Sequence, residues 1–416
     1  MATIDKSLPN TMTEVEIPGE EEIVEAKEEA VEEISSDGQT EIEMDEEGGA
    51  TINFDPGEVN PEGGEDHDAN LADFLEDNVL DPLASELMEK YTNYKQSRQE
   101  WADSYREGLN LLGFKYVTRT EPFRGASSVT HPVLAEAVTQ FQAQAYKELL
   151  PADGPVRTQI MGDANVAKEE QSKRVKDFMN YQIMDQMKEY EPEFDQMLFY
   201  LPLSGSTFKK VYYDDLLGRA VSKFIPAEDL VVPYSATSLE DAEAVIHVIR
   251  MSPNDLRKQQ INGFYRDIDL GEPPVQEDKL KQKELELEGI QQNGTEDVYT
   301  ILEMHVDVDL EGHEDVNPED GEPTGIKLPY IITIDEANEK VLSIRRNYAP
   351  EDPLKKKKDY FVHFKFLPGL GFYGLGLIHM IGGLSRTATV ALRQLLDAGT
   401  LANLPAGFKT RGVRMR

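Results

Sequence analysis

The chain changes character within LPLSGSTFKKVYYDD, residues 201–215. Upstream of this stretch, apolar and aromatic residues recur every three, four or seven positions, which is typical of helices with one buried face. Downstream, short β-branched and aromatic runs lie between clusters of Gly, Pro and Asp, which indicates strands joined by turns. Because helices and strands form separate blocks, the sequence predicts an α+β fold rather than a doubly wound sheet.

The upstream block predicts three helices, over about 70–112, 133–150 and 166–187. Gly113 ends the first of them. The downstream block predicts strand regions that begin near residues 206, 218, 243, 298, 328 and 360. A short helix over 253–261 and a charged helix over 277–292 are expected between these strands.

A last helix is expected from about 376 to 397. Its apolar residues recur at spacings of four and three and form a heptad-like seam made of Leu377, Ile381, Leu384, Ala388, Ala391 and Leu395. Arg386 and Arg393 lie seven residues apart, about 200° around the helix from this seam. The pattern fits an amphipathic surface helix of a monomer, and it equally fits a ring whose helices pack by the seam and turn their arginines towards a polyanion.

Charge is distributed unevenly along the 416 residues, whose formal net charge is −37. Residues 1–80 hold 26 acids against two lysines, whereas the chain from Lys355 onward holds 11 bases against two acids. The first 70 residues alternate acids with isolated apolar residues and cannot bury enough apolar surface to offset the entropy of ordering. We therefore expect a disordered acidic tail, either simply solvated or occupying a basic surface.

Several classes of site are absent from the sequence. The chain has no cysteine, which excludes disulfides, cysteine metal ligands and a cysteine nucleophile. It has no P-loop motif and no G-x-S-x-G motif, and its N-terminus lacks the basic and apolar runs of a signal peptide. We expect a protein that is no enzyme, needs no cofactor and stays in the cytoplasm.

One motif favours an alternative. Residues Gly369 to Gly374 match G-x-G-x-x-G between a predicted strand and a predicted helix, the context of a loop that binds dinucleotide phosphates. A nicotinamide-dependent oxidoreductase is therefore the alternative function. However, the following window lacks the second strand and the acid that such a unit requires, so a glycine hinge is the favoured interpretation.

Two further patterns are weaker. Residues 366–385 carry no formal charge over a length that could span a membrane, but they contain six glycines and Pro368, so no membrane partner is expected.

His305, Asp307 and Asp309 alternate along one predicted strand and resemble a metal site. Pro318 occupies the position where a calcium-binding loop starting at Asp307 needs Glu, so we expect a solvated strand face and no metal.

Three stretches carry a resemblance to a known family. LPLSGSTFKKVYYDD (201–215), GASSVTHPVLAEAVTQFQAQAYKELLPADGPV (125–156) and FLPGLGFYGLGLIHMIGGLSRTATVALRQLLDAGTLANLPAGFKTRG (366–412) resemble the portal, or head-to-tail connector, proteins of short-tailed double-stranded DNA bacteriophages. The resemblance covers about residues 80–416. It implies a dodecameric ring at the capsid vertex that passes viral DNA during packaging and ejection. The implied partners are the terminase large subunit, capsid proteins and tail adaptors, and the implied location is the virion, with the host cytoplasm during assembly.

The resemblance also implies a division of the chain. Residues 71–270 would form the wing, 271–366 a charged helix and clip-like strands, and 367–416 a glycine hinge, a stem or channel helix and the start of a tunnel loop. Family members continue beyond this point, so the chain is expected to be truncated at its C-terminus.

A channel that moves DNA needs contacts with phosphates rather than with bases, because base-specific contacts would stall movement. The candidates for such contacts are Arg386, Arg393, Lys409, Arg411, Arg414 and Arg416. A second basic cluster follows Pro353 in an expected loop and is a candidate to face terminase at the clip: Lys355, Lys356, Lys357 and Lys358.

Overall fold

The computed structural model describes residues 41–44, 50–53, 67–114, 118–162, 165–214, 217–273, 279–289, 298–316, 324–369 and 371–403. The chain divides into one unit that ends at Ala69 and a second that begins at Asn70. In the first unit, strand β1 (Glu41–Met44) pairs antiparallel with β2 (Ala50–Asn53). The segment for which we expected no order therefore contains one short hairpin, and the rest of residues 1–66 lies outside the described residues.

The second unit contains two antiparallel sheets and is mixed α+β, which confirms the predicted fold class. The larger sheet has the order β5-β6-β7-β8-β9, and the smaller sheet has the order β10-β3-β4. The bounds of the strands are β3 Ser206–Asp214, β4 Arg219–Pro226, β5 Leu230–Val231, β6 Ala244–Met251, β7 Tyr299–Val308, β8 Leu328–Asp335, β9 Lys340–Arg346 and β10 Phe361–Lys365. All six predicted strand regions are present.

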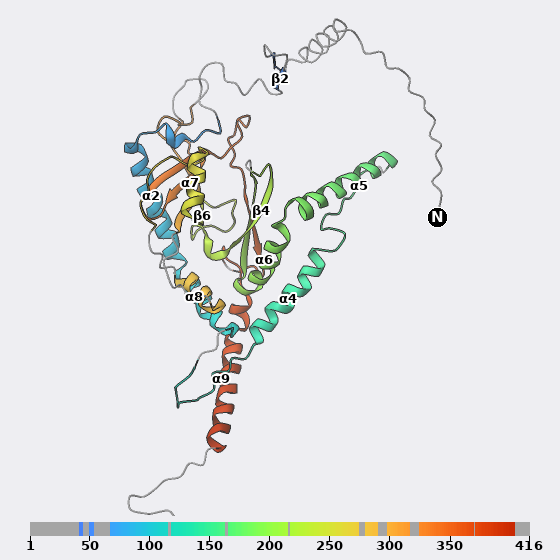
Figure 1. The fold of residues 1–416 in the computed structure, drawn as a ribbon, viewed down its shortest axis with the longest axis vertical. Helices are drawn as coiled ribbons and strands as arrows, with labels where there is room; N and C mark the ends of the chain where they lie inside the picture. Colours follow the sequence, from blue (N-terminus) through green and yellow to red (C-terminus); the bar gives the residue numbers. More distant parts are fainter. Residues whose placement is uncertain are drawn as a thin grey trace, which may run out of the picture. The chain divides into compact units, whose positions relative to one another are not determined.

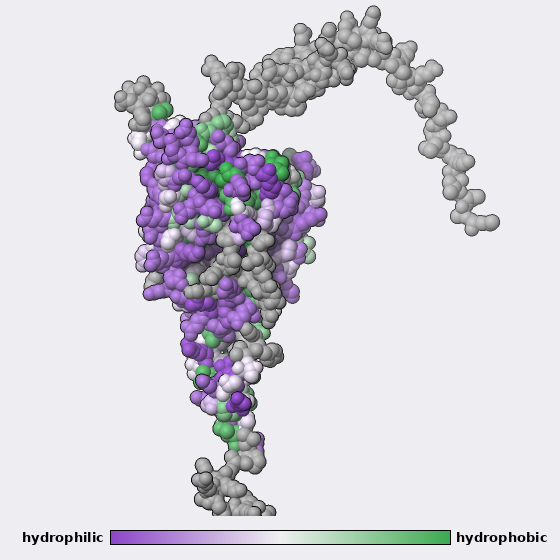
Figure 2. All heavy atoms as spheres, turned by 60° about the vertical axis from the view of Figure 1, so that its left-hand side comes forward, coloured by the Kyte–Doolittle hydropathy of each residue, from purple (hydrophilic) through white to green (hydrophobic). Residues whose placement is uncertain are grey.

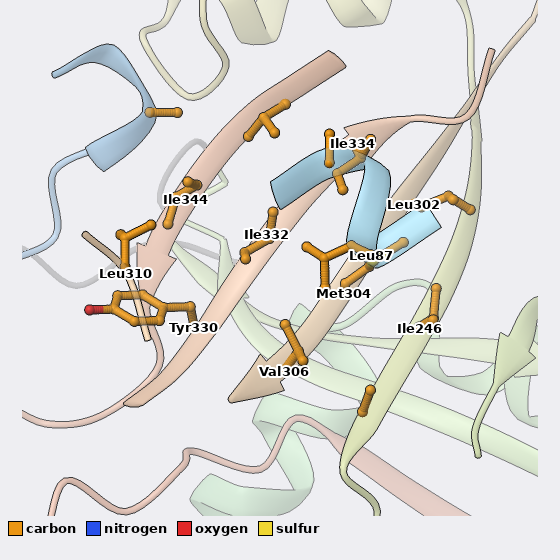
Figure 3. Close-up of a cluster of buried hydrophobic side chains, with 14 of the residues drawn as sticks. Leu87, Ile246, Leu302, Met304, Val306, Leu310, Tyr330, Ile332, Ile334 and Ile344 are labelled. Carbon is orange, nitrogen blue, oxygen red and sulfur yellow. The ribbon is translucent and has the colours of Figure 1, made fainter. Parts of the chain in front are cut away.

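One face of the larger sheet forms the main core with helix α2 (Asp77–Ser97). Alternate residues of β7, namely Leu302, Met304 and Val306, point to this face, as the two-residue period of a strand requires. Figure 3 shows Leu87 of α2 over these side chains and those of the neighbouring strands. The opposite face of β7 carries polar residues and meets the smaller sheet, where Lys210 of β3 reaches Glu303.

Some of the remaining helices lie beside the sheets, whereas α9, the last described element, extends away from them (Figure 1). Their bounds are η1 Leu71–Asp73, α3 Gln99–Leu109, η2 Asn110–Leu112, α4 Val133–Leu149, α5 Val166–Tyr181, the π-turn η3 Gln182–Gln186, α6 Tyr190–Ser204, η4 Ala227–Asp229, α7 Pro253–Ile261, α8 Lys279–Glu288 and α9 Leu377–Asn403. Helix α6 was not predicted, because Pro192 and Pro202 lie within it.

The first predicted helix is two helices that meet at Arg98, where the backbone leaves helical geometry. The Arg98 guanidinium donates to the carbonyl oxygens of Ala227, at 2.9 Å, and Leu230, at 2.8 Å, and to that of Glu228. These acceptors lie about 130 residues further along the chain, so they leave no trace in the local pattern. The break therefore follows from tertiary contacts.

The boundary expected near residue 270 does not separate two bodies. Strand β6 pairs with β7 over eight residues on either side of this boundary, and β10 pairs with β3. The strands assigned to a clip thus belong to the same two sheets as the strands assigned to the wing. Among the described residues, no helix is both long enough and apolar enough to cross a bilayer.

Candidate functional site

Helix α9 is held against the rest of its unit by one face. Its buried residues are Ile378, Gly382, Ser385, Thr389 and Asp397, at spacings close to one or two helical turns. Near the start of the helix, Ile378 packs so closely on Gly108 of α3 that a Cβ at Gly108 would lie 2.3 Å from the Ile378 side chain. The close approach of α3 and α9 therefore depends on a residue without a side chain.

The C-terminal half of α9 is bordered by the segment 118–132, which lies beside it in Figure 1. The backbone N–H of Ser127 donates to the Asp397 carboxylate at 2.6 Å, and that of His131 donates to the Thr389 hydroxyl at 3.0 Å. Arg393 donates from Nε to the carbonyl oxygen of Val129 at 2.7 Å. Polar side chains of α9 thus satisfy backbone groups of a segment without regular structure.

The predicted seam lies on another face of α9, centred about 130° around the helix from the buried one. Leu377 and Ile381 are half-buried against the unit's own apolar residues, but Leu384 and Leu395 are each 70% exposed. Met380 adds to the exposed apolar surface. Apolar residues are correspondingly interspersed with polar ones at the α9 end of the unit in Figure 2. We call Met380, Leu384, Ala388, Ala391 and Leu395 the α9 stripe.

The two arginines of α9 have different surroundings. Arg386 is exposed and donates to Glu107 at 2.8 Å, and a pair in which both side chains are about 70% exposed contributes little to stability. Arg393 donates hydrogen bonds within the chain, to the carbonyl oxygen of Val129 and to the Thr130 hydroxyl at 3.2 Å. Arg386 is therefore the more available of these two candidates for phosphate contact.

A cleft of about 840 Å³ lies between α3, α8, α9 and the segment 118–132. Its basic residues are Arg119, Lys283, Arg386 and Arg393, and its acids are Glu107 and Glu286. Burial and the adjacent Arg119 lower the pKa of Arg393, an effect that Asp397 opposes. The cleft is thus a region of excess positive charge. No local pattern indicated that Arg119 and Lys283 would lie beside the predicted arginines.

In the basic cluster 355–358, lysines with partners inside the chain alternate with exposed lysines. Lys355 pairs with Asp315 at 2.6 Å, and Lys357 donates to the carbonyl oxygen of Glu240 at 2.8 Å. Lys356 and Lys358 are exposed. Only these two side chains of the cluster are presented to solvent, so a partner at this loop would meet half of the predicted charge. The remaining predicted candidates, Lys409, Arg411, Arg414 and Arg416, lie outside the described residues.

Two glycines of the predicted G-x-G-x-x-G loop, Gly369 and Gly374, serve close packing of the backbone, whereas Gly371 has open space around it. A Cβ at Gly374 would lie 2.4 Å from the carbonyl oxygen of Gly205, and the Gly374 N–H donates to the buried Ser206 hydroxyl at 2.7 Å. A Cβ at the following Gly376 would lie 2.3 Å from the carbonyl oxygen of Leu203. A dinucleotide loop follows a parallel strand, whereas β10 runs antiparallel to β3.

The expectation of a solvated strand face is wrong for His305, whereas Asp307 and Asp309 on the same strand face are exposed. The His305 side chain is 9% exposed and lies between the two sheets, 2.8 Å from Glu303, which also binds Lys210 at 2.6 Å. Burial opposes ionisation of Glu303, but Lys210 and His305 hold the pKa of this carboxyl well below its usual range. The described residues contain no cluster of three or more His, Asp or Glu side chains suited to a metal ion.

Comparisons with known proteins give no family assignment. No protein-family model matches the chain, and no curated protein matches it significantly. The residues described above must therefore carry any functional conclusion.

Proposed function

We propose that this protein is a ring-forming structural subunit that conducts double-stranded DNA, of the portal type that the sequence resembles. The observation that carries the proposal is α9. One face of this helix packs on its own unit, the α9 stripe is exposed, and Arg386 lies on the side away from the stripe. A helix of this kind suits a ring in which neighbouring subunits cover the stripe and the basic side meets a polyanion.

The charge pattern supports sequence-independent contact with DNA. The cleft beside α9 has four basic residues against two acids, and the ion pair that Arg386 makes within the described part of the chain is with an exposed glutamate. Contacts of this kind attract phosphates, are screened by salt and do not read bases. They suit a channel through which DNA must move. The dodecameric copy number, the capsid vertex, terminase and tail adaptors rest on the resemblance.

Virions assembled with an Arg386→Gln variant test the DNA contact. Because Arg386 is exposed and weakly paired, the ring is expected to assemble normally, while the DNA content per virion or its retention changes with salt concentration. Glu107→Gln is the matched control, since it removes the partner of Arg386 and leaves the cation in place. Packaging and retention of DNA equal to those of the unaltered protein at every salt concentration would exclude Arg386 from the channel.

A further inference from the structure

Beyond Gly383, helix α9 is attached to its unit by polar rather than apolar side chains. Among the described residues, the apolar clusters of the unit include α9 side chains from its first two turns only: Leu377, Ile378 and Ile381. Residues 384–403, which we call the α9 arm, extend for about 30 Å away from the sheets (Figure 1). The buried side chains of the arm are all polar: Ser385, Thr389 and Asp397. The direction of the arm therefore depends on hydrogen bonds to the segment 127–131, which we call the strap.

Three side chains of the arm hold the strap by its backbone. At one end of the strap, the Ser127 N–H donates to the Asp397 carboxylate at 2.6 Å. At the other end, the His131 N–H donates to the Thr389 hydroxyl at 3.0 Å. Between these two positions, Arg393 donates to two backbone carbonyl oxygens of the strap, at 2.7 and 3.4 Å. The three side chains follow one another at one helical turn, so the strap is bound along most of the arm.

A weak point for bending lies just before the arm. Gly382 and Gly383 are adjacent within the helix, and glycine is the least favourable residue of a helix interior apart from proline. A Cβ at Gly383 would meet open space, so close packing does not require a glycine there. The Thr387 hydroxyl donates to the Gly383 carbonyl oxygen at 3.0 Å, a contact with the preceding turn that weakens and bends helices. Pairs of small residues are among the usual places of sharp helix kinks.

We propose that the strap fixes the direction of the α9 arm, and that the arm bends at Gly382 and Gly383 when the strap opens. Arg386 and most of the α9 stripe lie beyond these glycines, so a bend changes the direction in which both face. The hinge belongs to the single chain and does not depend on the formation of a ring. In the ring proposed above, a bend at this point changes the position of Arg386 relative to the channel.

Hydrogen exchange at Ser127 in the intact protein measures how often the strap opens, because the Ser127 N–H is bound by the arm. Thr389→Val removes the acceptor of the His131 N–H and leaves that of Ser127 in place. Since the loss of one hydrogen bond shifts an equilibrium about fivefold, exchange at Ser127 is expected to become about five times faster. Thr400→Val is the matched control, because the Thr400 hydroxyl bonds within the helix itself, and it is expected to leave exchange at Ser127 unchanged.

Alanine at the hinge tests whether opening of the strap is coupled to bending. Gly383→Ala favours the unbent helix and is expected to slow exchange at Ser127 about fivefold. Gly399→Ala is the matched control, because Gly399 also has open space around it but lies beyond the strap contacts. It is expected to leave exchange at Ser127 unchanged. Equal exchange at Ser127 in the two glycine variants, or in Thr389→Val and Thr400→Val, would overturn the proposal.

The bend itself is measured as a distance by pulsed EPR. The chain has no cysteine, so spin labels attach only at Gln140→Cys on α4 and Gln394→Cys on the arm, both exposed positions. With labelled chains diluted in unlabelled protein, we expect one narrow distance between the labels. Removal of all three strap contacts, by Thr389→Val, Arg393→Ala and Asp397→Ala together, is expected to add a second distance, which Gly383→Ala then suppresses. A single unchanged distance without the strap contacts would show that the arm does not bend.

Discussion

The exposed leucines of the α9 stripe allow a quantitative test of assembly. Burial of a leucine side chain is worth about 1.5–3 kcal/mol, and Leu384 and Leu395 are each 70% exposed in the isolated chain. If a neighbouring subunit covers both, replacing them by serine removes about 2–4 kcal/mol from each subunit contact. That loss corresponds to a drop of about 30- to 1,000-fold in the association constant.

The fold of the single chain is not expected to change, because substitutions at exposed positions usually alter the free energy of unfolding by less than about 0.5 kcal/mol. Sedimentation velocity over a range of concentrations measures the assembly, and chemical unfolding measures the stability. Leu396→Ser is the control for the serine substitutions in the stripe. Leu396 is also exposed, but it lies about 100° around the helix from Leu395. Equal assembly by the double variant and the unaltered protein, or an equal defect in Leu396→Ser, would refute a subunit contact at the stripe.

Three further outcomes follow from the described contacts. Gly376→Ala is expected to cost about 1–3 kcal/mol of unfolding free energy, because its Cβ meets the backbone at Leu203, whereas Gly371→Ala, with open space around it, is expected to be neutral; equal losses in chemical unfolding would contradict this. Burial lowers the pKa of His247 and of His363 to about 3, so the unfolded chain binds protons that the folded chain does not, and stability measured by unfolding should fall as the pH drops from about 6.5 towards 3; a fall that is equally steep in His247→Phe would show that His247 does not contribute. Glu303→Gln leaves Lys210 buried without its partner and is expected to destabilise the fold by about 3–5 kcal/mol; a loss below about 1 kcal/mol would show that the pair is not held as described.

Periodicity located most elements of the second unit but few of their contacts. The helices α4 and α9 and all six strand regions follow from local patterns, because burial of one face imposes a period on the sequence. Helix α6 was missed because its prolines resemble breakers. In α6, Pro202 lies near the C-terminal end of the helix, which ends at Gly205 with a left-handed backbone. The residues around Pro202 are buried.

The candidate site could be predicted in outline only. The seam and Arg386 were found from spacing on one helix, whereas the partners of Arg393 lie about 260 residues earlier in the chain and have no local signal. The burial of His305 likewise involves a residue of the other sheet, since its ring lies 4.9 Å from that of Phe361 in β10.

Electron microscopy of the purified protein tests the central claim most directly. We expect closed rings with an open central channel, in which the α9 stripe lies in contacts between subunits and Arg386 is turned towards the channel. Monomers at every concentration and salt condition, or rings in which Leu384 and Leu395 remain exposed to solvent, would contradict it.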